Sequence, residues 1–291
     1  MSGKFGGNWT IKKLNTLRDY LIAYKKIFDA NPKARHLRTH YIDAFAGEGD
    51  LVFGYSTEET LFDIPTNHPG SVKIALSIPS PFHKYHFIEK DKNRYEKLLV
   101  ISDEFPHLRD RISIQHGDCR EELIKILESL DKRKDRAVVF LDPYGMQVEF
   151  DLLQKIAKTE VVDLWLLVPH AIGFMRQLTK SGEIISDLKA KLDRVFGEST
   201  WYEKFYSELK IENLFGEEET VINKKVNERD IAEYYNSRLN DIFVDVAPNP
   251  SVLKNNSNVP IFILCFASSN PKGAKTAIKI AKYLLEKKHG R

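Results

Sequence analysis

The sequence has little cysteine, no long apolar run and almost no excess of charge. Its two cysteines, Cys119 and Cys265, lie 146 positions apart, which does not match the close ligand pairs of a structural zinc site. No apolar stretch reaches the roughly 18 to 20 residues that span a bilayer, and the first residues lack the apolar core of a secretory signal. We therefore expect a cytoplasmic protein with reduced thiols, no metal and no membrane partner.

The net charge is only +3, from 44 basic and 41 acidic residues, which excludes a histone-like arm protein. The charges are nevertheless unevenly distributed. Residues 1–40 hold nine Lys/Arg and two acids, residues 272–291 hold seven and one, and residues 201–220 hold six acids and two lysines. The chain ends are predicted to form a positive face, with ordinary solvated helix surfaces as the alternative.

The composition is otherwise that of a globular protein. Hydrophobic residues make up 42% of the 291 positions and charged residues 29%, which is enough apolar material for a buried core. At this length we expect one large α/β domain. We divide it into a single domain over residues 1–291 that includes an N-terminal helical extension over 1–36 and a helical insertion over 172–225.

Strand and helix patterns alternate along the chain. Apolar residues recur every three or four positions over 11–28, which is the spacing of one helix face. The expected strands are 39–47, 84–90, 111–117, 137–142, 161–169, 242–248 and 260–268. The further expected helices are 69–77, 91–102, 119–130, 150–159, 228–240 and 273–288. Two of the strands, 137–142 and 161–169, are almost wholly apolar, which is typical of central parallel strands.

Two connections complete the fold prediction. Residues 50–69 contain glycine, proline and little periodicity, so we expect a long loop there. The polar segment 249–259 joins the last two strands, which indicates an antiparallel hairpin at one sheet edge. The whole pattern predicts an α/β, doubly wound, Rossmann-like sheet that is mostly parallel, with this C-terminal hairpin and a helical insertion. Ligands of such sheets bind at the carboxyl ends of the strands.

The first strand ends in the run D-A-F-A-G-E-G, which begins at Asp43 and continues through Phe45. Gly47 and Gly49 allow the backbone to approach a ligand, and the acid can bind a polar ligand group directly or through water. A nicotinamide fingerprint needs a third glycine where this chain has Val52. The run resembles motif I of class I S-adenosylmethionine-dependent methyltransferases, and a tight connection without a ligand is the alternative.

Acids also follow the next two strands. Glu89 stands where a carboxylate can accept both hydroxyls of a ribose, and Asp91 is expected to cap the following helix. Asp118, in a Gly-Asp pair, resembles the position at which methyltransferases of this class hold the adenine amino group. The alternative is that Asp118 only caps the helix over 119–130.

The fourth strand ends in the sharpest motif, Asp142-Pro143-Tyr144-Gly145. The Asp-Pro turn fixes the acid beside the sheet and presents an aromatic ring above it. This resembles the D-P-P-Y and D-P-F-G motifs of amino-methyltransferases that act on nucleobases, in which the acid accepts a hydrogen bond from an exocyclic amine and the ring stacks on the base. A core tyrosine at a strand-ending turn is the alternative.

Taken together, several motifs resemble the three-Cys-motif partner protein family, TcmP, over roughly residues 9–285. They are W-T-I-K-K-L, Y-I-D-A-F-A-G-E-G, F-I-E-K-D, F-L-D-P-Y-G-M, L-L-V-P and I-L-C-F-A-S-S-N. The resemblance implies a bacterial or phage-related, methyltransferase-like protein that associates with a second protein bearing three cysteines, of the radical S-adenosylmethionine type. The spelling D-P-Y-G is closer to D-P-F-G, seen in enzymes that methylate the guanine N2 amine of transfer RNA, than to D-P-P-Y, which leaves the acceptor base open.

Three functions follow from these residues. The first is a methyltransferase for an exocyclic amine of a nucleobase in DNA or RNA; S-adenosylmethionine would be held by Asp43, Phe45, Gly47, Gly49, Glu89 and Asp118, and the acceptor would be placed by Asp142, Pro143 and Tyr144. The second is a partner subunit that docks through its acidic, aromatic segment 201–219. The third is a nuclease with a divalent metal on Asp43, Asp118 and Asp142. The histidines near strand ends, His40, His86, His116 and His170, are expected to be structural.

Overall fold

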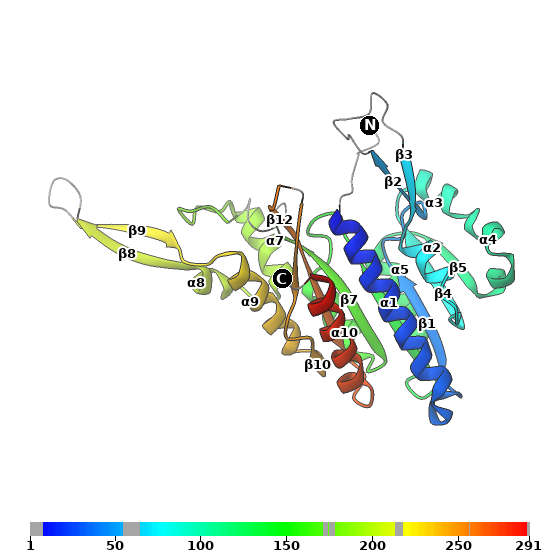
Figure 1. Cartoon of the computed structure of the whole chain (residues 1–291). Helices are drawn as coiled ribbons and strands as arrows, with labels where there is room; N and C mark the ends of the chain where they lie inside the picture. Colours follow the sequence, from blue (N-terminus) through cyan, green and yellow to red (C-terminus); the bar gives the residue numbers. More distant parts are fainter. Residues whose placement is uncertain are drawn as a thin grey trace.

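The computed structural model describes residues 8–54, 65–170, 174, 178–212, 218–255 and 257–289. Figure 1 shows a central sheet with helices on both faces and a two-stranded ribbon that projects to one side. The expected N-terminal extension, loop 50–69 and insertion 172–225 each include residues outside the described set. No helix in the described part of the chain is long and apolar enough to cross a membrane.

The main sheet has the predicted doubly wound form. In spatial order its strands are β5 (Ile112–His116), β4 (Lys84–Glu89), β1 (Arg38–Asp43), β6 (Asp135–Leu141), β7 (Val162–Pro169), β12 (Pro260–Ser268) and β10 (Asp245–Val246). The pairs from β5 to β7 are all parallel, whereas β12 runs antiparallel to β7 and to β10. The doubly wound, Rossmann-like sheet, mostly parallel with an antiparallel part at its C-terminal end, is therefore confirmed. Strand order reverses beside β1, between β1 and β6, which is where such sheets bind ligands.

The antiparallel C-terminal hairpin is present, but its first strand differs from the prediction. We expected 242–248 as the strand and 249–259 as a polar connection. The structure limits the first of these to the two residues of β10 and forms β11 (Ser251–Lys254) within the second. The side chains of Ser251 and Leu253 are buried against β12, and this short alternation was hidden among the surrounding polar residues.

Alternation along the strands divides the core between the two faces of the sheet. In β6, Val138 and Phe140 pack on one face, and Val139 and Leu141 pack on the other. The first face is covered by α1 (Asn8–Ala30), α2 (Ser71–Leu76), α3 (Lys92–Leu98), α4 (Ile101–Glu104) and α10 (Ala274–His289). The second face is covered by α5 (Cys119–Ser129), α6 (Phe150–Lys158), α7 (Ser186–Phe196), α8 (Trp201–Phe205) and α9 (Glu228–Asn240). Short 3-10 turns, η1 (Pro32–Ala34) and η2 (Pro106–Arg111), lead into β1 and β5.

Helix α1 is fixed to the sheet by a buried polar contact as well as by its apolar stripe. The Tyr20 hydroxyl donates to Asp163 Oδ2 of β7 at 2.7 Å, and the Ser268 hydroxyl of β12 donates to the other carboxylate oxygen at 2.6 Å. The three residues lie within the core. Because α1 and α10 pack side by side, the described helices of the two basic chain ends lie on the same side of the sheet (Figure 1).

Two segments contain strands that periodicity did not predict. The expected loop 50–69 begins and ends in β2 (Asp50–Gly54) and β3 (Pro65–Pro69), which pair with each other. The insertion contains the expected helices α7 and α8 and also the ribbon of β8 (Tyr206–Glu212) and β9 (Glu218–Lys224). A two-stranded ribbon buries little surface of its own, so the apolar signal along these strands is weak.

Most of the aromatic residues of the insertion that the structure describes face the core. Trp201, Phe205 and Tyr206 are almost completely buried and pack with Phe196 and Tyr234. This corrects our expectation that the aromatic side chains of 201–219 form a docking surface. They instead hold the insertion against the domain, and the ribbon extends beyond them (Figure 1).

Candidate functional site

Two adjoining cavities lie at the carboxyl ends of β1, β4, β5 and β6. The larger, of about 580 Å³, is lined by Phe45, Gly47, Gly49, Asp142, Pro143 and Tyr144, with further residues of α1 and α3. The smaller, of about 410 Å³, is lined by Glu89, Asp118, Cys119 and Gln147 among others, and it shares Phe45, Asp91, Arg94 and Tyr144 with the first. Of the residues that the sequence singled out for cofactor and acceptor, only Asp43 lies beneath the cavity surface. The carboxyl ends of β1, β4, β5 and β6 therefore meet at one place, as expected for motifs that each follow a parallel strand of the same sheet.

The glycine turn after β1 has the backbone form that only glycine adopts easily. Gly47 and Gly49 have φ values of +66° and +89°, and a Cβ atom at Gly47 would meet nothing within 4 Å. The turn is held by its amides: Ala46 N donates to the Ile88 carbonyl at 3.0 Å, and Gly47 N donates to Glu89 Oε2 at 2.8 Å. The open space beside Gly47 is a cradle that a ligand can enter closely.

Glu89 links this turn to the next helix. Its second oxygen, Oε1, accepts a hydrogen bond from Asp91 N at 2.7 Å, and the side chain is almost buried. A carboxylate has about four acceptor positions, so two remain for ligand hydroxyls. The Asp91 side chain accepts from Arg94 N at 2.9 Å and so caps α3 as predicted.

Asp118 has the capping role, which is one of the two roles that we weighed for it. Its side chain accepts from Arg120 N at 2.9 Å and caps α5, and it pairs with Lys90 Nζ at 3.0 Å. This hydrogen bond from Lys90 lowers the pKa of Asp118, which keeps the acid ionised at the cavity edge. Next to it, burial raises the pKa of the Cys119 thiol to about 12, so Cys119 is an unreactive packing residue.

Asp43 is completely buried below the glycine turn. It accepts hydrogen bonds from Phe45 N at 3.2 Å and from the Tyr41 hydroxyl at 3.4 Å. Burial raises the pKa of Asp43 to about 7; the nearby Asp142 adds to this increase, and hydrogen bonds from Ser71 and Phe45 N oppose it. A cation bound above this carboxyl would favour its ionised form.

Asp142 forms an ion pair with Lys13 of α1. The Lys13 side chain is only 5% exposed, and its ammonium lies 5.2 Å from the centre of the Trp9 ring and 5.9 Å from that of Phe140. We did not predict Lys13, Trp9 or the neighbouring Thr10 as site residues. The sequence did contain a signal for Lys13. It lies three residues before Thr16 and four before Leu17, on the apolar face of α1, and a lysine in such a position needs a partner.

Tyr144 is presented to the cavity and to solvent. Its side chain is 61% exposed, which contradicts the alternative of a core tyrosine. The guanidinium of Arg94 lies 5.2 Å from the centre of its ring, and Gly145 follows with a φ of +82° that turns the chain away. An aromatic ring open to solvent beside a carboxylate suits the binding of a planar polar group.

The histidines do not join this site. His40 and His86 stack at 5.5 Å on neighbouring strands, and His40 also contacts Asp135 at 3.2 Å at the amino ends of the strands. Burial lowers the pKa of His86 and of His170 to about 4. Across the described ranges no three His, Cys, Asp or Glu side chains form a group that could hold a metal ion, and Asp43, Asp118 and Asp142 therefore do not form a three-carboxylate cluster.

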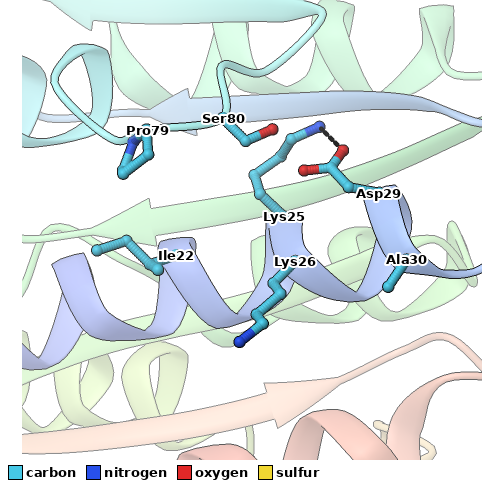
Figure 2. A pocket seen from close by; sticks show the side chains of 7 residues that line it. All are labelled: Ile22, Lys25, Lys26, Asp29, Ala30, Pro79 and Ser80. Atoms are coloured by element: carbon cyan, nitrogen blue, oxygen red, sulfur yellow. Dashed lines mark ion pairs between the residues drawn. The ribbon is translucent and has the colours of Figure 1, made fainter.

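Figure 2 shows a separate hollow of about 430 Å³ near the other end of α1. Lys25, Lys26 and Asp29 of α1 line it together with Pro79 and Ser80 of the connection before β4. The Lys25 ammonium already has partners, Thr39 Oγ1 at 3.2 Å and Asp29 Oδ1 at 3.7 Å. None of the four strand-end motifs reaches this hollow, so it is distinct from the candidate site.

Comparison with known proteins adds little to this geometry. No family model and no curated protein matches the chain, so the resemblance to the TcmP family stays a prediction. Among solved structures the chain is similar to a Legionella pneumophila protein of family DUF519, with 13% identity, 100% of this chain and 94% of the other covered, and a TM-score of 0.49. It is also similar to an rRNA methylase from Streptococcus thermophilus (10% identity, 86% and 93% covered, TM-score 0.35). A third similar structure is the N-terminal domain of EvdMO1 in the presence of S-adenosylhomocysteine and D-fucose (13%, 87% and 82%, TM-score 0.38). Likenesses of this strength say nothing of activity, and function is argued from the site itself.

Proposed function

We propose that this protein is an S-adenosylmethionine-dependent methyltransferase that modifies an exocyclic amine of a nucleobase in DNA or RNA. One observation carries the proposal. The carboxylate of Asp142 and the exposed ring of Tyr144 line the same cavity as the glycine turn at Gly47 and Gly49. A site for a cofactor and a site for a planar amine are thereby joined without an intervening wall of protein.

The residues present fit the cofactor. Glu89 has two acceptor positions left for ribose hydroxyls, and the open cradle at Gly47 admits a ligand close to the backbone. The ionised Asp118 lines the smaller cavity, where it can accept a hydrogen bond from an adenine amine. Asp43 provides a negative charge beneath a cationic ligand, and Phe45, whose amide donates to Asp43, lines the cavity.

The acceptor groups suit nitrogen methylation. When bound, the cofactor supplies an electrophilic methyl group on a sulfonium. Asp142 accepts a hydrogen bond from the amine and orients the nitrogen lone pair, Pro143 fixes that carboxylate, and Tyr144 stacks on the base. The nitrogen–methyl bond forms as the carbon–sulfur bond breaks, and a proton then leaves the nitrogen for solvent. A base must leave its helix to reach this pocket.

A basic surface on α1 and α10, on one face of the sheet, supports a nucleic-acid acceptor. Helices α1 and α10 pack together, and α10 exposes Lys275, Lys279 and Lys282 at spacings of three and four residues, so that they share one face. Lys12 and Arg18 are exposed on α1. Basic side chains of this kind bind phosphates without reading sequence.

A second candidate function is favoured by the ribbon of β8 and β9. It projects from the domain (Figure 1) and carries the exposed acids Glu208 and Glu218 along its strands. We propose that, if the chain belongs to the bacterial or phage-related TcmP family, this ribbon contacts the three-Cys-motif partner. A pull-down of that partner should then fail after residues 207–223 are replaced by a short Gly-Ser turn, and capture by this variant would refute the ribbon's role.

The first experiment on the cofactor site is a calorimetric titration with S-adenosylhomocysteine. We expect micromolar binding by the wild type and none by Glu89→Ala, because that change removes the two remaining ribose acceptors and releases the amides of Gly47 and Asp91. Glu48→Ala is the matched control, since Glu48 lines the larger cavity but is already paired with Lys97 Nζ at 2.6 Å. No binding by folded wild-type protein would contradict the methyltransferase proposal.

A further inference from the structure

The first turns of α1 bring polar groups to the larger cavity on the side opposite the acids. Thr10 and Lys13 both line it and, three residues apart, lie on one face of the helix. The Thr10 hydroxyl oxygen is buried and has no hydrogen-bond partner within the described part of the chain. A buried polar atom without a partner costs free energy, so this hydroxyl points to a ligand that supplies one.

Lys13 can serve a second anion in addition to Asp142. An ammonium has three N–H donors, and the two rings beside it, Trp9 and Phe140, occupy its surroundings without accepting a conventional hydrogen bond. The first turn of α1 contains no acid, and the positive end of the dipole of this 23-residue helix lies at the same place. This corner of the cavity therefore holds the Lys13 ammonium and the positive end of a helix dipole.

The rest of the two cavities is acidic at the strand ends. Asp43, Glu89, Asp118 and Asp142 suit hydroxyls, amines and cations, but they repel a carboxylate. Of the other cations that line the larger cavity, Lys97 is paired with Glu48 and Arg94 lies over the Tyr144 ring. The buried Lys13 with Thr10 is thus the place where the cavity can accept an anion.

We propose that Lys13 and Thr10 bind the α-carboxylate at the amino-acid end of S-adenosylmethionine, an inference that rests on the proposed function. Lys13 then bridges this carboxylate and Asp142. Binding of the cofactor therefore fixes the lysine that holds the acceptor-placing acid, and α1 becomes a part of the cofactor site.

The test compares S-adenosylmethionine with its decarboxylated analogue, which keeps the ammonium and the sulfonium but lacks the carboxylate. Calorimetry measures both affinities for the wild type, Lys13→Met and Thr10→Val. We expect the wild type to prefer the complete cofactor by about tenfold to about a hundredfold, the range of a hydrogen bond to a charged group. Lys13→Met should lose this preference, and Thr10→Val should lose a smaller part of it. Lys26→Met, on the same helix at the hollow of Figure 2, should keep it.

The outcomes separate the two proposals. If the wild type binds neither ligand, the methyltransferase proposal fails and this inference fails with it. If the wild type binds both but Lys13→Met and Thr10→Val keep the full preference, the inference alone is refuted. An equal loss of affinity for both ligands would also refute it, because Lys13 would then act only by supporting Asp142. Should Lys13→Met not fold, Thr10→Val decides, since valine has nearly the shape of threonine.

Discussion

The buried carboxyl of Asp43 should make cofactor binding depend on pH near neutrality. Burial and the neighbouring Asp142 raise the pKa of Asp43 to about 7, and the proposed ligand brings a cation above it. A cation binds the ionised carboxylate more strongly than the neutral acid, so affinity should increase as pH rises through about 7. With a pKa of 7, ionisation grows from about 9% at pH 6 to about 91% at pH 8, which predicts an increase in affinity of about tenfold.

The assay is calorimetry of S-adenosylmethionine binding between pH 5.5 and 8.5, in two buffers that differ in ionisation enthalpy. The difference between the buffers reports the protons released, which should approach one per ligand near pH 6 and fall toward zero above pH 8. Asp43→Asn should remove both the slope and the proton release. A flat affinity in the wild type, or the same slope in Asp43→Asn, would show that Asp43 is not the group that responds to the ligand.

Three further predictions concern stability and are checked by urea unfolding. Tyr20→Phe removes the hydrogen bond to the buried carboxyl of Asp163 and should cost about 1.5 to 3 kcal/mol; no change would mean that this contact does not hold α1. Glu89→Gln replaces an acceptor of two backbone amides by a group with one acceptor oxygen and should lower the free energy of unfolding by about 1 to 3 kcal/mol. An unchanged urea midpoint would show that Glu89 does not stabilise the two amides. Gly197→Ala should cost more than about 2 kcal/mol, because φ is +75° and the new Cβ would lie 2.2 Å from Phe150 Cδ1, and a stable variant would require the ring to move freely.

The sheet was predictable because its signals are strong and local. Nearly continuous apolar runs such as 137–142 and 161–169 indicate central strands. Four of the parallel strands end in an acid or a glycine turn, and the parallel arrangement brings these ends to one edge of the sheet. Asp43, Glu89, Asp118 and Asp142 could therefore be assigned to one place before any coordinates. Because the strands are parallel, residues that directly follow different strands lie close together in space.

Other parts of the structure depend on contacts that periodicity does not record. The ribbon of β8 and β9 and the short strand β11 pair at edges or outside the main sheet, where alternation is brief and half of the side chains are polar. Lys13 reaches Asp142 across 129 positions of sequence, and only the packing of α1 on the sheet brings the two together. A lysine among the apolar positions of a helix was the available signal.

The central claim is that this site transfers a methyl group to a nucleobase amine. The most direct measurement incubates the protein with S-adenosylmethionine labelled in its methyl group, separately with mixed bacterial RNA and with DNA, and follows the label into the nucleic acid. The account predicts incorporation with the wild type, recovered as an N-methylated base after digestion, and none with Asp142→Ala, although that variant still binds S-adenosylhomocysteine. Equal incorporation by Asp142→Ala, or none by a wild type that binds the cofactor, would contradict it.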